Sequence, residues 1–267
     1  MYGPKRDLLL LDNNILASPD YEVIINEILD AGFEKGATFA GKQRRLDFNQ
    51  GMDARLLTPT KMKLLAKTAI KPLRLAFDQS RMRKSYERAV RLACKYGVNR
   101  HSTYVLFNYN DTPEDFYRRL RINIELNEEL DVKISSFPMK YIPFTSKNRR
   151  YIGKYWHRKL IRGFQCILLV TKGMVSPRRE FFDAAFGCNE QEFREICMMP
   201  EHYIIYRRDH DEPATEWRKL YHQLGSVQHQ RLLEVLANGK IKKEDCVKES
   251  GRLRKIMGHY IDPVSSK

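Results

Sequence analysis

Short apolar runs that end in polar residues recur through the first half of the chain at intervals of roughly 30 residues, as in repeated βα units. Each run predicts a β-strand, and the five predicted strands lie within residues 8–11, 45–57, 73–77, 103–107 and 132–137. The first run is four leucines followed by Asp12, Asn13 and Asn14. Because a continuous apolar run is typical of a strand covered on both faces, this run predicts a buried parallel strand.

Helical patterns fill the intervals between these runs. Residues 20–31 carry an apolar stripe at helical spacing that stops at Gly32, and residues 80–96 predict a strongly basic helix closed by Gly97. Two Thr-Pro pairs each place a proline at the first position of a predicted helix, where the missing N–H costs nothing. The alternation of strands and helices predicts an α/β fold with a parallel sheet.

The second half of the chain has a different character. Aromatic residues at helical spacing predict helices over residues 177–197 and 213–236, and the pattern of separate strands does not recur. We therefore predict two domains, an α/β domain over residues 1–145 and a mainly helical region over residues 146–267.

Polar side chains follow the predicted strands, and right-handed crossovers would bring the strand ends to one rim. The residues expected to converge there include Asn13, Asn14, Asn49, Gln50, Asp78, Asn108 and Asn110. Any one of them, taken alone, is more often a loop residue that satisfies its own turn. Their recurrence at successive strand ends favours a ligand-binding face.

The charge of the chain adds a second possibility. With 267 residues, 42% of them hydrophobic, the chain is long enough for a large core, and its net charge of +15 favours anionic partners such as nucleic acid. Residues 147–162 combine basic side chains with Tyr151, Tyr155 and Trp156, which are the ingredients of single-stranded nucleic-acid binding. They are equally the ingredients of an amphipathic helix packed on a core, and the helical spacing of Tyr151, Ile152 and Tyr155 favours that interpretation.

The cysteines and apolar runs exclude several classes of protein. Five cysteines stand at wide spacings without a Cys-x-x-Cys pair, a pattern that describes neither a disulfide framework nor a zinc site. There is no signal-peptide pattern, and no apolar run approaches the ~20 residues that span a bilayer. We therefore predict a cytoplasmic protein with reduced thiols and no membrane partner.

Three stretches together resemble the radical S-adenosylmethionine superfamily. These are residues 8–16, the Asp-Phe-Asn-Gln-Gly-Met-Asp-Ala-Arg stretch at residues 47–55, and residues 104–115, and the resemblance covers about residues 5–145. It implies a partial (β/α) barrel of parallel strands, here strands 2 to 6 of that core. It also implies S-adenosylmethionine and a [4Fe-4S] cluster as cofactors. In an intact enzyme of this kind, reductive cleavage gives a 5′-deoxyadenosyl radical that abstracts hydrogen from a substrate, which this sequence does not identify.

The resemblance also implies roles for the polar strand ends. Asp12, Asn13 and Asn14 would face the methionine moiety of the cofactor, and Asp78 or Gln79 would face its ribose. Asn108 and Tyr109 would lie on the adenine side. Asn49 and Gln50, in the second predicted strand region, complete the predicted binding set.

One departure from the family pattern is large. The family holds its cluster with Cys-x-x-x-Cys-x-x-Cys in the loop after its first strand, and this spacing does not occur here. The resemblance thus implies that the first βα unit is missing, which predicts an exposed edge at residues 8–11 and either poor solubility or a complementing N-terminal segment or subunit. Either the chain is a truncated radical enzyme or it is a non-catalytic scaffold. In both cases we expect no reductive cleavage by this chain alone.

Overall fold

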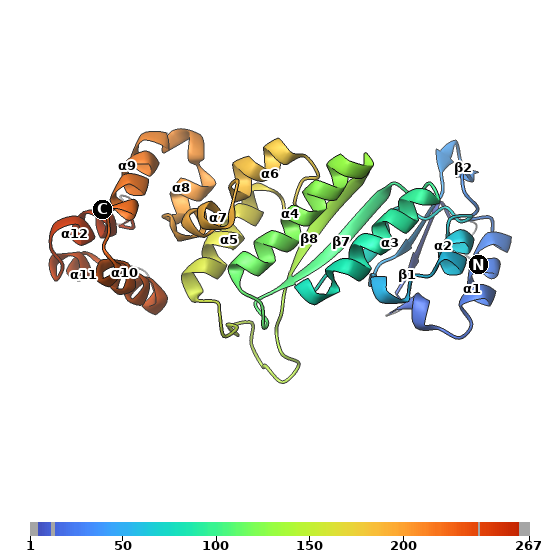
Figure 1. Cartoon of the computed structure of the whole chain (residues 1–267), viewed down its shortest axis with the longest axis horizontal. Helices are drawn as coiled ribbons and strands as arrows, with labels where there is room; N and C mark the ends of the chain where they lie inside the picture. Colours follow the sequence, from blue (N-terminus) through green and yellow to red (C-terminus); the bar gives the residue numbers. More distant parts are fainter. Residues whose placement is uncertain (1–4, 12–13, 240, 262–267) are drawn as a thin grey trace. The chain divides into compact units, whose positions relative to one another are not determined.

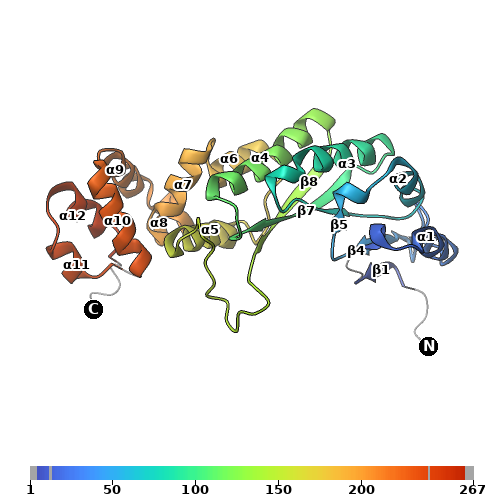
Figure 2. The same ribbon diagram turned by 60° about the horizontal axis from the view of Figure 1, so that its bottom comes forward.

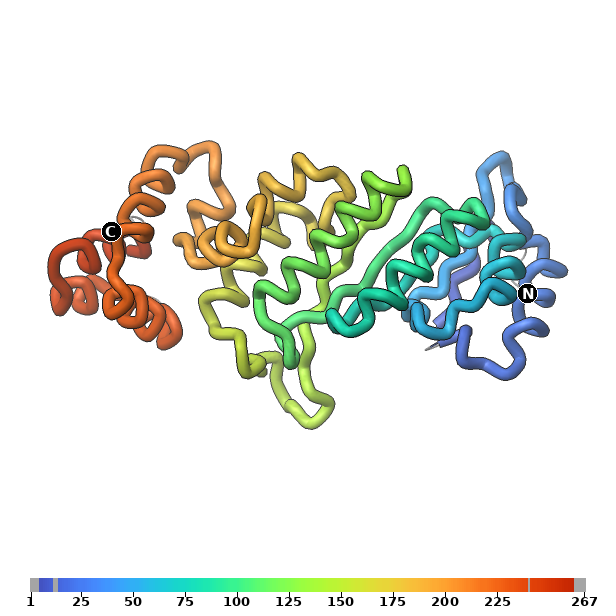
Figure 3. Tube along the Cα trace, viewed as in Figure 1, coloured from blue at the N-terminus to red at the C-terminus, as the bar shows by residue number. Residues whose placement is uncertain are grey.

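The structure is a computed structural model that describes residues 5–11, 14–239 and 241–261. Asp12 and Asn13, two of the predicted ligand-binding residues, lie outside the described residues. The described chain divides into two compact units, whose trace Figure 3 follows. Unit 1 is drawn from Met1–Phe107, Asp115–Tyr141 and Met174–Phe182, and unit 2 from Asn108–Glu114, Ile142–Gly173 and Asp183–Lys267. The boundary predicted at residue 145 stays a prediction, since these units are discontinuous in sequence.

Unit 1 contains parallel strands in two sheets (Figure 1). They are β1 (Asp7–Leu10), β4 (Arg45–Phe48), β5 (Met52–Asp53), β6 (Leu73–Ala76), β7 (Arg100–Phe107) and β8 (Lys133–Lys140). β1 pairs with β4, and the larger sheet has the order β5-β6-β7-β8, with every one of these pairs parallel. The predicted α/β fold with a parallel sheet is therefore confirmed.

The helices of unit 1 share one hydrophobic core with the strands. They are α1 (Tyr21–Asp30), α2 (Pro59–Leu65), α3 (Arg83–Lys95) and α4 (Pro113–Leu130), and in Figure 2 α3 and α4 lie along the same face of the larger sheet. Alternate residues of strand β7 face this core: Thr103 and Val105 are fully buried, while their neighbours are partly exposed. One face of each strand thus fills the core beneath the helices.

Among the described residues, the opposite face of the sheets is partly exposed, which corrects the prediction that the first strand is covered on both sides. Leu9 on β1 is 54% exposed, and Phe137 and Met139 on β8 are exposed as well. The helices of unit 1 pack against the other face, so only alternate residues of each strand reach the core. Within the described part of the chain, β4 is the strand that pairs with β1.

The second predicted strand, residues 45–57, is broken in two. Strands β4 and β5 are separated by a turn in which Gly51 has a φ of +81°, a conformation that residues other than glycine rarely adopt. The sequence pattern also missed a short hairpin formed by β2 (Thr38–Phe39) and β3 (Lys42–Gln43). Its strands have two residues each, too few to show an alternating pattern.

Unit 2 is helical, as predicted for the C-terminal region. Its helices are α5 (Arg158–Val170), α7 (Glu190–Met198), α8 (Glu201–Ile205), α9 (Asp211–His222), α10 (Ser226–Asn238), α11 (Lys243–Val247) and α12 (Gly251–Gly258), and α6 (Arg179–Phe186) belongs in part to each unit. The helices predicted over residues 177–197 and 213–236 are each two helices, because Gly187 with a φ of +89° ends α6 and Gly225 precedes α10. None of the described helices is both long and apolar enough to cross a membrane.

Candidate functional site

A pocket of about 340 Å³ lies at the carboxyl ends of β1, β4, β5 and β6 in unit 1. We call it the strand-end pocket. Its lining residues are Asn14, Gln50, Gly51, Met52, Asp53, Arg55, Ala76, Asp78, Gln79, Arg81 and Met82. Four residues of the predicted binding set, Asn14, Gln50, Asp78 and Gln79, therefore come together from loops that are far apart in the sequence.

The turn after β4 is held by close packing against β7. The hydroxyl of Tyr104 donates a hydrogen bond of 2.6 Å to the carbonyl oxygen of Asn49. A Cβ atom at Gly51 would lie 2.8 Å from the Tyr104 ring, which is closer than side chains tolerate. Asn49 thus contributes its carbonyl to the structure of the turn, and the neighbouring Gln50 lines the pocket.

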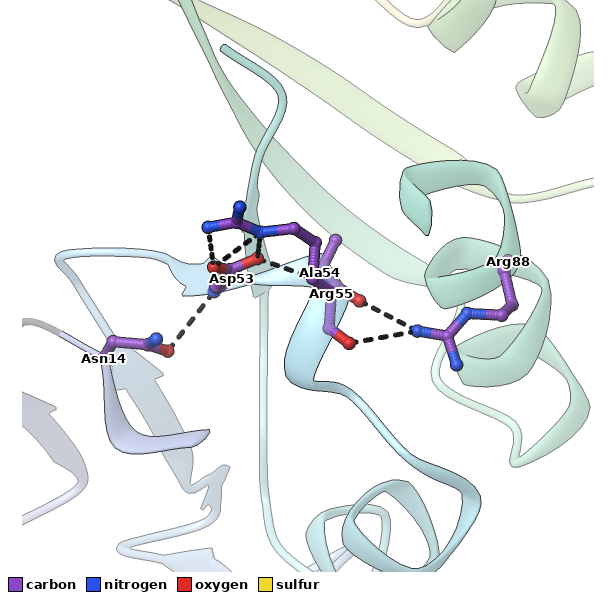
Figure 4. A network of polar contacts seen from close by, with 5 residues as sticks. All are labelled: Asn14, Asp53, Ala54, Arg55 and Arg88. Atoms are coloured by element: carbon purple, nitrogen blue, oxygen red, sulfur yellow. Dashed lines mark hydrogen bonds and ion pairs between the residues drawn. The ribbon is translucent and has the colours of Figure 1, made fainter. Parts of the chain in front are cut away.

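A network of polar contacts joins three residues that line the strand-end pocket, Asn14, Asp53 and Arg55, to Arg88 (Figure 4). The backbone N–H of Asp53 donates to Asn14 Oδ1 at 3.3 Å, and Arg55 donates to the Asp53 carboxylate from its backbone N–H and its guanidinium. Arg88 on α3 donates to the carbonyl oxygen of Arg55 at 3.3 Å. The Arg55 hydrogen bonds lower the pKa of Asp53, so this carboxylate stays ionised at neutral pH.

Asp78 follows the end of β6, and its surroundings shift its pKa in the direction opposite to that of Asp53. Burial raises its pKa, and the nearby charge of Arg119 partly offsets that rise. Arg119 is fully buried and donates from one guanidinium nitrogen to the carbonyl oxygens of Phe77, Asp78 and Leu106, at 3.1, 3.0 and 2.8 Å. This single arginine therefore ties the carboxyl ends of β6 and β7 together and fixes the backbone that carries Asp78.

Sequence reasoning missed several charged residues of this site. Asp53 and Arg55 stand inside the stretch at residues 47–55 that carries part of the family resemblance, and this stretch is the sequence signal for them. Arg81 belongs to a short 3₁₀ turn that opens the basic helical segment and does not stand out among its many cations. Arg119 has no sequence signal, because an arginine on an amphipathic helix normally faces solvent.

Asn108 and Tyr109 belong to unit 2. Asn108 is fully buried with a φ of +69°, and its side chain donates to the Tyr151 carbonyl at 3.1 Å and accepts from the Gly153 N–H at 2.8 Å. Its amide thus holds residues 151–153 in place. The role predicted for Asn108 and Tyr109 on the adenine side stays a prediction.

The basic and aromatic segment at residues 147–162 differs from its predicted helix. Helix α5 begins only at Arg158, and the bonds from Asn108 hold the preceding backbone in a non-helical path. Trp156 is buried and donates to the Asp111 carbonyl at 3.0 Å, whereas Tyr155 is half exposed. The predicted packing of aromatic rings on a core is therefore correct for Trp156 and wrong for Tyr155.

The cysteines do not form a metal centre. Cys94, Cys166, Cys188, Cys197 and Cys246 stand on different elements or loops. Among the described residues, no three His, Cys, Asp or Glu side chains are grouped so that they could hold a metal ion. Since soft thiolates are the ligands of iron–sulfur clusters, the side chains of this chain do not fit the cluster that the resemblance implies.

Comparison of the sequence with models of known protein families gives no match, and comparison with curated proteins gives no significant similarity. The geometry of the pocket is therefore the basis for a functional conclusion.

Proposed function

We propose that unit 1 is a partial (β/α) barrel that binds S-adenosylmethionine in the strand-end pocket. The observation that supports this proposal is the convergence of Asn14, Gln50, Asp78 and Gln79 on one pocket at the carboxyl ends of parallel strands. Ligands of parallel α/β folds bind at that end of the sheet. The volume of about 340 Å³ lies near the lower end of the usual range for small-molecule sites, roughly 300–1,000 Å³.

The chemistry of the lining fits a zwitterionic nucleoside. The carboxylates of Asp53 and Asp78 are acceptors for an ammonium group and for ribose hydroxyls, and the amides of Gln50 and Gln79 both donate and accept. Arg81, exposed on the 3₁₀ helix Ser80–Met82, offers a guanidinium to the α-carboxylate. In this proposal Asn14 and Asp53 hold the methionine moiety, and Asp78 with Gln79 holds the ribose.

Bound S-adenosylmethionine supplies a sulfonium centre, and this chain supplies binding and orientation. Because its thiolates do not fit an iron–sulfur cluster, the proposal contains no radical step by this chain alone. Radical formation would require a cluster from another polypeptide segment.

Equilibrium dialysis of the full chain with radiolabelled S-adenosylmethionine tests the proposal. We expect saturable binding that Asp78→Asn weakens by about ten-fold or more, because a hydrogen bond to a charged group contributes roughly 1.5–3 kcal/mol. The control is Asp20→Asn, an exposed aspartate outside the pocket, which should bind as the wild type does.

The ligand series sharpens the test. Methionine and adenosine, offered separately, should each bind more weakly than the intact cofactor, because each fills only part of the pocket. Urea denaturation of both variants shows whether a loss of binding reflects a loss of folding. The proposal is wrong if the folded wild-type chain shows no saturable binding at millimolar S-adenosylmethionine.

A further inference from the structure

A second pocket lies at the opposite, amino-terminal ends of the strands of unit 1. Its volume is about 350 Å³, and it is formed by the segments that precede β4, β6 and β7 together with the loop after α1. Four cations from four segments line it, namely Lys35, Arg44, Lys71 and Arg100. None of the described residues that line it is an aspartate or a glutamate. We call it the basic pocket.

The side-chain hydrogen bonds of these cations go to neutral groups. Arg44 donates to the carbonyl oxygens of Ala31 and Gly32 at 2.9 and 3.0 Å, and the Lys71 ammonium lies 3.5 Å from the side-chain oxygen of Gln43. These partners are neutral. Within the described part of the chain, no carboxylate forms an ion pair with any of the four cations. A concave surface lined by charges of one sign focuses the electric field and attracts counter-ions.

Glycines keep the basic pocket open. Gly97, with a φ of +75°, would place a Cβ atom 3.2 Å from the Lys35 ammonium, so a side chain there would crowd that charge. Gly36, with a φ of +85°, faces open space. A neutral donor, the exposed amide of Asn99, stands among the cations, whereas the buried hydroxyl of Thr68 already donates to the Leu65 carbonyl at 2.7 Å. Positive charge combined with neutral donors is the donor set that binds phosphate oxygens.

The positive surface continues beyond the basic pocket. Lys133, exposed at the start of β8, is the register partner of Arg100. Lys67 is exposed as well, and its carbonyl oxygen accepts a 2.6 Å hydrogen bond from the backbone N–H of Lys35. Lys67 therefore also borders the pocket. A single phosphate would occupy only the centre of such a surface. A run of cations suits a polymer that carries a phosphate at every repeat.

We propose that the basic pocket and its rim, Lys67 and Lys133, bind the phosphate backbone of a nucleic acid, independently of any ligand in the strand-end pocket. The pocket holds one phosphate between Lys35, Arg44 and Arg100, and the rim lysines contact the phosphates on either side. The interaction reads backbone charge rather than base sequence, because the lining residues present cations instead of groups arranged for base edges.

Fluorescence anisotropy of the full chain with a labelled single-stranded RNA 20-mer of mixed sequence tests this proposal. We expect binding at 50 mM salt that weakens steeply as the salt concentration rises. The logarithm of the association constant should fall with the logarithm of the salt concentration, and each phosphate contact should make this slope steeper by about 0.7. The double variant Lys35→Gln/Arg100→Gln should lower affinity by about ten-fold or more and reduce that slope by about 1.4. Both side chains are exposed, so the fold should be retained.

Two controls make the result specific. Lys63→Gln/Lys84→Gln removes the same net charge from exposed positions on α2 and α3 outside the pocket, and it should change affinity less than two-fold. The charge-conserving pair Lys35→Arg/Arg100→Lys should keep RNA binding. The proposal is overturned if the two charge-removing double variants bind alike, or if tripolyphosphate binds through the pocket while RNA does not bind.

Discussion

The two ends of the parallel strands of unit 1 carry pockets of similar size and different electrostatic character. The strand-end pocket has about 340 Å³ and combines carboxylates with cations: Asp53 pairs with Arg55, and Asp78 lies within the influence of Arg119. The basic pocket has about 350 Å³ and is lined by cations without a described carboxylate. Unit 1 thus offers a charge-balanced site suited to a zwitterion and a cationic site suited to a polyanion.

Chain direction explains part of this difference. In a βα unit the loop after a strand leads into the amino end of a helix, whereas the loop before the next strand follows the carboxyl end of a helix. Unpaired carbonyl groups at helix carboxyl ends form a negative pole that attracts cations. Arg44 shows the effect directly, because it donates to the carbonyls of Ala31 and Gly32 at the end of α1. The carboxyl end of α1 therefore favours one of the four cations of the basic pocket.

The largest expected effect comes from removing the buried arginine behind the strand-end pocket. Arg119→Met would leave three backbone carbonyls without their shared donor. We expect the free energy of unfolding to fall by about 3–5 kcal/mol, because breaking a buried charged contact exposes unpaired polar groups to an apolar interior. Urea denaturation measures this loss.

The neighbouring arginine provides the matched control. Arg118→Met removes an exposed side chain whose ion pair with Asp115 has a nitrogen–oxygen distance of 3.8 Å, and it should change stability by less than about 1 kcal/mol. If both substitutions cost the same, Arg119 does not hold the strand ends together as its hydrogen bonds indicate.

Acid should change the free energy of unfolding in opposite directions through residues at the two ends of the strands. His101 on β7, next to Arg100 of the basic pocket, is buried, and burial lowers its pKa to about 4. The unfolded chain protonates this histidine near pH 6.5, so stability falls as the pH drops from about 6.5 to 4, by up to about 3 kcal/mol. His101→Leu should flatten this part of the curve of unfolding free energy against pH.

Asp78 should behave in the reverse way. Its pKa is raised by burial, so the folded chain takes up a proton more readily than the unfolded chain, and the contribution of this residue to stability decreases as the pH rises. The stability gained from Asp78→Asn should therefore be larger at pH 7 than at pH 4. A gain that is the same at both values would show that Asp78 is not desolvated.

Alanine substitution of two glycines, one in each pocket, distinguishes the cost of backbone strain from the cost of steric crowding. Gly51 and Gly36 both have positive φ, but a Cβ at Gly51 meets Tyr104 at 2.8 Å and one at Gly36 meets nothing within 4 Å. Gly36→Ala should cost about 1 kcal/mol, from conformation alone, and Gly51→Ala about 2–3 kcal/mol. Thermal unfolding of the two variants tests the difference, and equal costs would mean that Tyr104 moves aside freely.

The strands and the polar strand ends were predictable because they follow local rules. An apolar run bounded by turn residues marks a strand, and the crossover rule places successive strand ends on one side. That reasoning found Asn14, Gln50 and Asp78, and the family resemblance added Gln79; the structure brings all four into one pocket. It did not show that one sheet face is partly exposed, because a leucine such as Leu9 looks the same in sequence whether or not another element covers it.

Other features depend on contacts between distant residues. The basic pocket was invisible in the sequence because its four cations are separated by long intervals and stand among 48 lysines and arginines. Trp156 is buried, but the helix predicted around it is replaced by a loop that Asn108 holds from a distant part of the sequence. Neither the pairing of a loop with a remote amide nor the gathering of separate cations leaves a periodic signal.

The smallest expected effect tests the link between β1 and the strand-end pocket. Asn14 accepts a hydrogen bond from the Asp53 backbone N–H at 3.3 Å, a long and partly exposed contact. Asn14→Ala should lower the free energy of unfolding by only about 0.5–1 kcal/mol, and Asn14→Asp, which keeps an acceptor, should lower it less. The alanine variant should nevertheless weaken S-adenosylmethionine binding in dialysis while RNA binding at the basic pocket stays unchanged, because the two sites lie at opposite ends of the strands. A loss of both activities in a variant that remains folded would show that the two pockets are coupled.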